Sequence, residues 1–263
     1  MPVETQAAPS KAALYTGYTL TILFTLFMLM DAGVKFTHAA PVIQANNELG
    51  FPLALVPAIG VLALILLALY LIPATSVLGA VLFTGYFGGA IALHLRIDHP
   101  LFSYTLFPIY IALFLWGGIW LRDARLRQLF PLTETPFASP ASRAQLLTGR
   151  ALIALGAFMI IATAILKFTF VPPAGAPELF PKHHIHHLGY LEFICIALYL
   201  IPRTSVLGSV LLTGYLGGAT CINLRSGDSL GTSLVPALIS VILWAGLWLR
   251  DTRLRAQLPL RSR

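Results

Sequence analysis

The stretch ALYLIPATSVLGAVLFTGYFGGAIALHLR, residues 68–96, returns later in the chain as ALYLIPRTSVLGSVLLTGYLGGATCINLR, residues 197–225. The two stretches agree at 21 of 29 positions. A second match follows, in which WGGIWLRDARLR at residues 116–127 corresponds to WAGLWLRDTRLR at residues 244–255. Similarity at a fixed spacing over this length indicates that one unit of a little over a hundred residues has been duplicated in tandem.

The composition of the chain is typical of a membrane protein. Hydrophobic residues make up 57% of the 263 positions and charged residues only 10%, whereas about 25% of the residues in soluble domains are charged. A membrane-spanning helix needs about 20 mostly apolar residues, and runs of this kind fill most of the chain. A soluble globular fold is therefore excluded, and the lipid bilayer is the expected partner.

Apolar runs divide each copy into four expected helices. The residue before a proline is biased away from the helical conformation, and Pro73 and Pro202 stand between the second and third helix of their copies. The sequence therefore predicts an all-α fold, a polytopic membrane helix bundle of eight transmembrane helices in two parallel four-helix repeats. Because four is even, both copies share one orientation, so the repeat axis is expected along the membrane normal. The expected helices cover residues 13–36, 51–72, 75–95 and 102–121 in the first copy, and 147–170, 186–201, 204–224 and 230–249 in the second.

The distribution of basic residues predicts the orientation of the chain. Lys and Arg number 17 against 10 Asp and Glu, and they gather in short loops between apolar runs, which is a sign of topology rather than of nucleic-acid binding. Most of them fall on the side of the two termini, so the positive-inside rule predicts cytoplasmic termini and an inner (plasma) membrane location. The expected organisation is an N-terminal cytoplasmic tail (1–12), a first repeat (13–128), a cytoplasmic linker (129–146), a second repeat (147–256) and a cytoplasmic tail (257–263).

The repeated motif LYLIPxTSVLGxxLxTGYxGG, the Arg that ends its helix and the following WxGxWLRDxRLR resemble the DoxX-like family of small four-helix membrane proteins. Asp31-Ala32-Gly33-Val34-Lys35, at the end of the first expected helix, resembles that family as well. The resemblance covers nearly the whole chain and implies two fused units. The family is mostly uncharacterised. A relative in the wider superfamily is a subunit of a thiosulfate:quinone oxidoreductase, which implies at most a redox role with quinone as cofactor and other membrane subunits as partners.

Seven ionisable residues within or beside the expected spans form a candidate intramembrane polar cluster. A charged residue at the centre of a span costs roughly 2.5–3.5 kcal/mol on insertion scales, so each is expected to be paired or to face a polar cavity. The arginine near the outer end of each third helix either snorkels to lipid headgroups or contacts a ligand. The cluster consists of Asp31, Lys35, His94, Arg96, Lys167, Glu192 and Arg225.

The two copies place their carboxylates on different helices. In the first copy, Asp31 precedes Lys35 by four residues, a favourable spacing for an ion pair on a helix. The second copy replaces this Asp with Thr163 and carries Glu192 on its next helix instead. We therefore predict that Lys167 contacts Glu192, either as a structural pair between two helices or as part of a polar pocket or proton path.

Small residues on the third helix of each copy predict close helix packing. Two glycines four residues apart let two membrane helices approach closely. Tyr86 and Tyr215 recur in the same block, which the duplication alone explains. The candidate packing residues are Gly85, Gly89, Gly214 and Gly218.

The segment HHIHH holds the most unusual side chains of the chain. Histidines three and four residues apart share one face of a helix, so two imidazoles are placed to bind one metal ion. Glu192 or Cys195 is then a candidate further ligand. The alternative is that these histidines are polar, partly titrating residues at the membrane surface. The candidate metal ligands are His183, His184, His186 and His187.

Three functions remain open from the sequence. The first is an accessory or structural membrane protein; the alternatives are a quinone-linked membrane oxidoreductase subunit and a small-solute transporter. The sequence contains neither a glycine-rich phosphate-binding motif nor a C-x-x-C-H haem attachment motif, which argues against an ATP-driven pump. No cofactor is evident from a motif, and whether the chain is an enzyme stays open.

Overall fold

The computed structural model describes residues 9–37, 39–133, 142–171 and 179–261, and this part of the chain is helical without strands. The expected tails and linker lie partly outside these ranges. The first unit contains α1 (Lys11–Val34), α2 (Ala40–Leu49), η1 (Leu53–Leu55), α3 (Val56–Leu71), α4 (Ser76–Arg96), η2 (Leu101–Thr105), α5 (Phe107–Arg122) and α6 (Ala124–Arg127). The second unit contains α7 (Arg143–Thr169), α8 (Lys182–Leu200), α9 (Ser205–Arg225), α10 (Leu230–Ser233), α11 (Val235–Arg250) and α12 (Thr252–Arg255).

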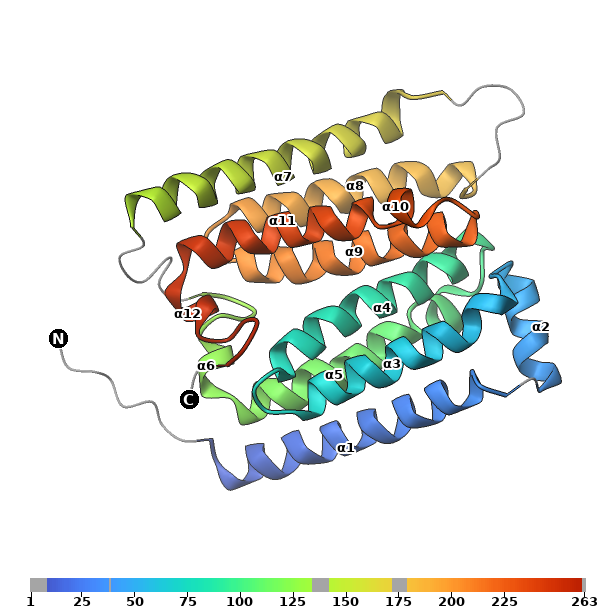
Figure 1. Ribbon diagram of the computed structural model, residues 1–263, viewed down its shortest axis with the longest axis horizontal. Coiled ribbons are helices and arrows are strands. Elements are labelled where there is room, and N and C mark those ends of the chain that lie inside the picture. The colour runs from blue at the N-terminus through green and yellow to red at the C-terminus, as the bar shows by residue number, and fades with distance from the viewer. Residues whose placement is uncertain (1–8, 38, 134–141, 172–178, 262–263) are drawn as a thin grey trace.

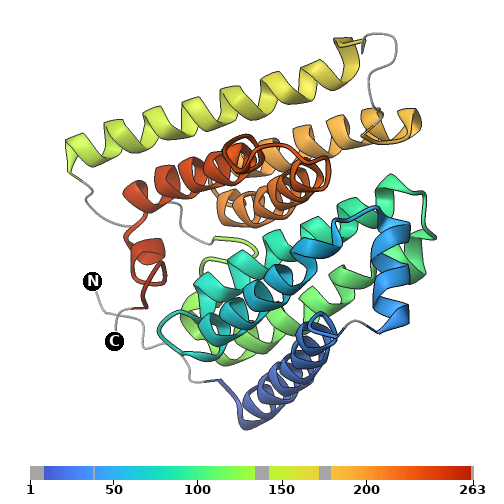
Figure 2. The same cartoon turned by 45° about the vertical axis from the view of Figure 1, so that its right-hand side comes forward.

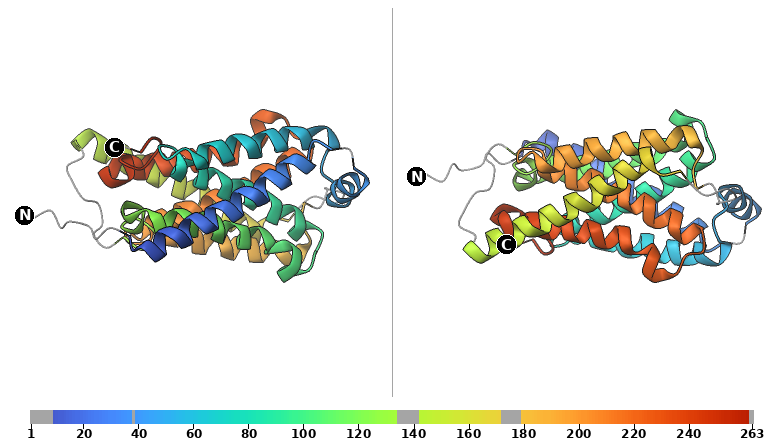
Figure 3. Two further views of the ribbon diagram at one scale, coloured as in Figure 1. Left: turned by 90° about the horizontal axis from the view of Figure 1, so that it is seen from below. Right: turned by 90° about the horizontal axis from the view of Figure 1, so that it is seen from above.

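The long helices of both units lie side by side in one bundle (Figure 1). The helices α1 and α7 occupy opposite edges, and α4 and α9 meet in the middle, where they form the most extensive helix pair of the described structure. The short helix α2 crosses one end of the bundle, as the turned views also show (Figures 2 and 3). The main core draws buried side chains from both units, including Phe24, Phe83, Leu212 and Leu243.

Seven helical segments of the described structure are long and apolar enough to span a membrane, which confirms the polytopic membrane bundle. The eighth long helix, α8, packs against α7 and α9. It carries four histidines in its first two turns and Glu192 further on, which makes it less apolar than the others. The seven segments are Lys11–Val34, Leu53–Leu71, Ser76–Arg96, Leu101–Arg122, Arg143–Thr169, Ser205–Arg225 and Leu230–Arg250.

The predicted turns at the two prolines are confirmed. Ile72 and Ile201, which precede Pro73 and Pro202, are both extended with φ −77° and ψ 119°, as the steric demand of the proline ring requires. Each preceding helix therefore ends there, and the next helix begins within five residues. The matching backbone angles show that the duplication preserves this turn.

The helices α4 and α9 run in the same direction and pack through glycine. A Cβ atom at Gly88 would overlap the Gly214 carbonyl oxygen, and one at Gly217 would overlap the Gly85 carbonyl oxygen. Each third helix thus packs closely through its small-residue block, and its partner, which the sequence did not identify, is the third helix of the other unit. The closest points are Gly88 and Gly217. Both are adjacent to a predicted glycine, and the Gly-Gly doublets of the repeat were the signal for them.

The four predicted glycines themselves leave more room for a Cβ atom than Gly88 and Gly217 do. A Cβ atom at Gly85 would lie 3.5 Å from the nearest atom, and one at Gly214 would lie 3.4 Å away. At Gly89 the nearest atom is the Cys221 Cβ at 3.1 Å, and at Gly218 it is the Gly88 carbonyl oxygen at 3.0 Å. The requirement for glycine therefore differs along the interface.

The segment after the last long helix of each unit crosses to the other unit. The Thr133 N–H donates to the Arg203 carbonyl oxygen at 2.8 Å, and the Arg261 N–H donates to the Ala74 carbonyl oxygen at 2.7 Å. The acceptors belong to the proline turns of the opposite units. An ion pair of 3.0 Å between Arg261 and Asp123 adds to this contact. The two units are thus joined reciprocally at the end where α6 and α12 lie.

Basic residues concentrate at that same end, which we call the basic end. It holds the start of α1 and the end of α12 (Figure 1). The opposite end holds the end of α1, the start of α8 and the helix α2. The basic end carries Lys11, Arg122, Arg125, Arg127, Arg143, Arg150, Arg203, Arg250, Arg253, Arg255 and Arg261, and the opposite end Lys35, Arg96, Lys167, Lys182 and Arg225.

Candidate functional site

A lysine, a carboxylate and a tyrosine form a polar group near the end of α1, which we call the unit-1 triad. The Lys35 Nζ lies 2.6 Å from the Asp31 Oδ1, and the Tyr86 hydroxyl on α4 donates to the Asp31 Oδ2 at 3.0 Å. Lys35 also donates to the Asp31 carbonyl oxygen at 3.2 Å. The expected pair of Asp31 and Lys35 is therefore present and is tied to α4 through the tyrosine.

The second unit builds the same group from three helices, and we call it the unit-2 triad. The Lys167 Nζ on α7 lies 2.6 Å from the Glu192 Oε2 on α8, so the predicted contact is confirmed. The Tyr215 hydroxyl on α9 donates to the same Glu192 oxygen at 3.3 Å. The Glu192 side chain is only 1% exposed. Burial of a carboxylate is costly unless it is paired and hydrogen-bonded, so these partners are needed for its place in the core.

The residue that replaces Asp31 in the second unit holds the relocated carboxylate. Thr163 donates from its hydroxyl to the Glu192 Oε1 at 2.5 Å, and its carbonyl oxygen accepts from the Lys167 Nζ at 3.2 Å. Both lysines also lie near the ring of their tyrosine, at 6.0 Å in the first unit and 5.6 Å in the second. Lysine, carboxylate and tyrosine thus meet in both units, but the carboxylate comes from a different helix. Its two partners bind separate oxygens in the first unit and share one oxygen in the second.

Two arginines, one from each unit, converge on the end of α2. The Leu49 carbonyl oxygen accepts from the Arg96 Nη2 at 3.0 Å and from the Arg225 Nε at 3.3 Å. Leu49 is the last residue of α2, and Gly50 follows in the left-handed conformation with φ 62°. Positive charge is favourable at a helix C-terminus, so both arginines fasten α2 across the end of α4 and α9.

A histidine pair lies beside this contact. The Nδ1 atoms of His94 and His99 lie 2.8 Å apart, and the His99 Nε2 lies 3.1 Å from the Glu48 Oε1 on α2. The Tyr104 ring is tilted against both histidine rings, with centroids 5.9 Å and 4.9 Å away. The residues predicted as one polar cluster are therefore distributed over two triads, an arginine pair and a histidine pair.

The histidine segment contacts the first unit. The His183 Nε2 and the His184 Nε2 lie 3.1 Å and 2.6 Å from the Asp98 Oδ1. The hydrogen bond from His184 is the main cause that lowers the pKa of the Asp98 carboxyl below its ordinary value. Asp98 was not among the predicted ligands. It comes close to α8 only because the two units pack against each other, and the sequence does not reveal that packing.

The remaining candidates for that site have other contacts. The His186 ring stacks on Phe168 with centroids 5.2 Å apart, and Glu192 belongs to the unit-2 triad. Cys195 is buried. In the described part of the chain, His183 and His184 are the histidines that face Asp98. The sharing of a metal ion by histidines three and four residues apart stays a prediction.

A small hollow lies next to the unit-1 triad. It has a volume of about 240 Å³ and lies between the end of α1, the helix α2 and the start of α3. Lys35 and Thr37 are its polar lining residues, and its other walls are aliphatic. Lys35 thus takes part in the unit-1 triad and also lines this hollow.

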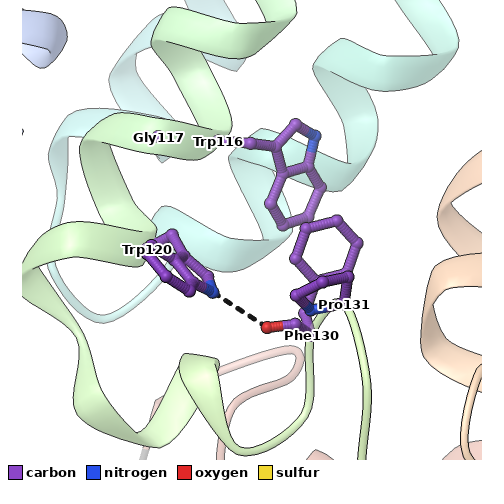
Figure 4. A pocket seen from close by; sticks show the side chains of 5 residues that line it. All are labelled: Trp116, Gly117, Trp120, Phe130 and Pro131. Carbon is purple, nitrogen blue, oxygen red and sulfur yellow. Dashed lines mark hydrogen bonds between the residues drawn. The ribbon is translucent and has the colours of Figure 1, made fainter.

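A second hollow, at the basic end, has a different character (Figure 4). It has a volume of about 250 Å³ and is lined by Trp116, Gly117, Trp120, Phe130 and Pro131. The Trp120 Nε1 donates to the Phe130 carbonyl oxygen at 2.9 Å, and the Trp116 and Phe130 rings stack with centroids 4.9 Å apart. These contacts anchor the segment after α6, which is a structural role.

The comparisons with known proteins agree with the internal repeat. The model of the DoxX-like family matches the chain twice, over residues 19–118 and 150–246. Comparison with curated proteins and with solved structures gives no match. The chain is a member of the DoxX-like family and contains two tandem copies of its membrane unit.

Proposed function

We propose that the protein is an accessory or structural component of the membrane, in which the two triads hold the helices of each unit together. The observation that supports this role is the relocated carboxylate. A catalytic carboxylate must keep its position relative to the reacting atoms, since small displacements cost large factors in rate. A carboxylate that neutralises a lysine within the bilayer must only reach that lysine, which both Asp31 and Glu192 do.

The physical need for such pairs follows from the bilayer. Charged side chains within spans are costly and are usually paired with one another. In the unit-2 triad the ion pair joins α7 to α8, and the Tyr215 hydroxyl adds α9. The contacts that neutralise and bind the Glu192 carboxylate therefore also connect three helices.

We infer that the chain lies in the inner (plasma) membrane with the basic end in the cytoplasm. The support is the excess of Lys and Arg at that end, because short cytoplasmic loops carry such an excess. On this orientation α2, the arginine pair and the histidine segment lie on the outer side.

A quinone-linked role is the second candidate, and the hollow beside Lys35 is the observation that favours it. A lysine that lines an aliphatic hollow is suited to donate a hydrogen bond to a quinone carbonyl. The volume of about 240 Å³ is below the roughly 300–1,000 Å³ of common ligand pockets. Lys35 is also already paired with Asp31, so the structural role is favoured.

One experiment separates the two candidates. The double variant Lys35→Met with Asp31→Asn removes the unit-1 pair without leaving a lone charge, and Lys167→Met with Glu192→Gln is the matched control in unit 2. Each protein is purified in native lipid, and its quinone content is measured after solvent extraction. The accessory role predicts the same quinone content, close to that of the lipid, in all three proteins. A stoichiometric quinone that only the unit-1 variant loses would contradict it.

A further inference from the structure

We propose that Asp98, His183 and His184 bind one divalent transition-metal ion of the Zn²⁺ type between the two units. Asp98 follows α4 of the first unit, and the histidines belong to the first turn of α8 in the second unit. The proposal goes beyond the accessory role and does not depend on it, because it concerns another group of residues at the surface.

The three side chains already converge at the spacing of metal ligands. One ligand atom from each of the three side chains lies within 4.8 Å of the other two. Zinc bonds to imidazole and carboxylate are about 2.0–2.2 Å long, which separates tetrahedral ligand atoms by roughly 3.3 Å. The observed distance of 3.1 Å from the His183 Nε2 to the Asp98 Oδ1 lies close to this value. The distance of 2.6 Å from the His184 Nε2 is shorter, so these two atoms must move apart when a metal ion enters between them.

The backbone of Asp98 is held in an unusual conformation that aims its carboxylate at α8. Its φ is 53°, the only positive value for a residue other than glycine in the described structure. Residues other than glycine rarely adopt a positive φ, and among them Asp and Asn tolerate it best. The histidines contact the Asp98 oxygen that this conformation presents.

The surroundings allow a metal ion to enter. The side chains of His183 and Asp98 are 60% and 51% exposed, whereas His184 is 17% exposed. Two ligands are thus accessible from solution, and the third is fixed by packing. The two imidazole nitrogens favour Zn²⁺, Co²⁺, Ni²⁺ or Cu²⁺ over Mg²⁺ and Ca²⁺, which prefer oxygen ligands only.

The neighbouring imidazoles are less suited to the same ion. In the histidine pair, the His99 ring nitrogens already contact His94 and Glu48. The His186 ring stacks on Phe168 within its own unit. His186 therefore provides a control, because it stands on the same turn of α8 but makes no hydrogen bond to Asp98 in the described structure.

Metal titration of the purified full chain tests the site. The protein is prepared with an affinity tag that lacks histidine, stripped with EDTA, and titrated with Co²⁺, whose visible d–d absorption reports tetrahedral coordination. Zn²⁺ displacement of Co²⁺ and isothermal titration calorimetry give the affinity, and Mg²⁺ serves as the negative control. The variants are Asp98→Asn, His184→Gln and the control His186→Gln.

We expect one equivalent of Co²⁺ or Zn²⁺ per chain. Asp98→Asn keeps a residue that tolerates the positive φ but loses the anionic ligand, and it should weaken binding at least about tenfold, as even outer-shell changes do at metal sites. His184→Gln should do the same, and His186→Gln should bind like the unchanged protein. Melting temperatures without metal verify that each variant is folded.

Two results would overturn the proposal. The first is a wild-type chain that binds neither Co²⁺ nor Zn²⁺. The second is metal binding that Asp98→Asn leaves intact or that His186→Gln abolishes equally, which would assign the ion to the histidine segment alone. A variant that fails to fold is replaced by His183→Gln, whose exposed side chain carries little packing.

Discussion

The Thr163 hydroxyl lies 2.5 Å from the Glu192 Oε1, so the residue that replaces Asp31 in the second unit binds the carboxylate that takes over its role. In both units this carboxylate accepts from a lysine at 2.6 Å. The two units therefore preserve a group of side chains rather than the position of each side chain in the sequence. This is the behaviour expected of a contact that stabilises helices in the bilayer.

Removal of one charge of the unit-2 triad should destabilise the protein more than removal of both. Lys167→Met leaves Glu192, which is 1% exposed, as a lone buried charge, and such a loss costs about 3–5 kcal/mol. Glu192→Gln should cost less, because the Lys167 side chain is 23% exposed. The double variant should be more stable than Lys167→Met alone. Thermal unfolding in detergent measures all three, and additive losses from the two single changes would show that the residues are not coupled.

The unit-1 triad should be less sensitive to the same changes. The Lys35 and Asp31 side chains are 20% and 30% exposed. Asp31 lies on α1 and Lys35 is the C-cap residue of the same helix, so their ion pair connects no second helix by itself. We expect Asp31→Asn to lower stability by about 1 kcal/mol, as is common for accessible pairs. Thermal unfolding of Asp31→Asn and Glu192→Gln, measured in parallel, tests this ranking. A larger loss of stability for Asp31→Asn than for Glu192→Gln would contradict it.

The repeat explains why the fold was predictable. Two copies of one block predict two copies of one set of helices, and long apolar runs bounded by prolines give their number and approximate limits. The lysine of each triad was identified because it stands within an apolar run. The pairing of Lys167 with Glu192 was predictable because comparison of the copies shows one carboxylate lost and another gained.

The contacts between the units could not be predicted in the same way. The approach of Asp98 to His184 and of Arg225 to Leu49 depends on how the two units dock, which no helical period reveals. The short helix α2 was expected as a loop, because its ten residues are only weakly apolar. The roles of Tyr86 and Tyr215 were missed because their recurrence is also what duplication alone would produce.

Alanine at the two closest glycines should disrupt the α4 and α9 interface. A Cβ atom at Gly88 would overlap the Gly214 carbonyl oxygen, and a backbone oxygen cannot move aside, so Gly88→Ala should cost about 1–3 kcal/mol through overpacking. Gly85→Ala is the matched control, because its Cβ would lie 3.5 Å from the nearest atom. Thermal unfolding should show a loss for Gly88→Ala alone. Equal effects of both changes would contradict the observed register.

The orientation can be tested with reporters inserted at each end of the bundle. The excess of basic residues predicts that a reporter in the linker between the units, or after Arg255, lies in the cytoplasm. A reporter between α1 and α3 should lie outside, as should one between α7 and α8. Fluorescent and phosphatase fusions at these sites provide opposite signals. A cytoplasmic signal from the α7 to α8 connection would reverse the assignment.

The transfer of the carboxylate from α8 back to α7 tests the central claim most directly. The variant Glu192→Ala restores the alanine that the first unit has at the corresponding position, and the added change Thr163→Asp restores the spacing of Asp31 and Lys35. Thermal unfolding in detergent is measured for the wild-type chain, for Glu192→Ala and for the double variant. If the triad stabilises the contacts between helices, Glu192→Ala lowers the melting temperature clearly. The added change Thr163→Asp then recovers most of that loss through contacts with Lys167 and Tyr215. A double variant that is no more stable than Glu192→Ala would contradict the account.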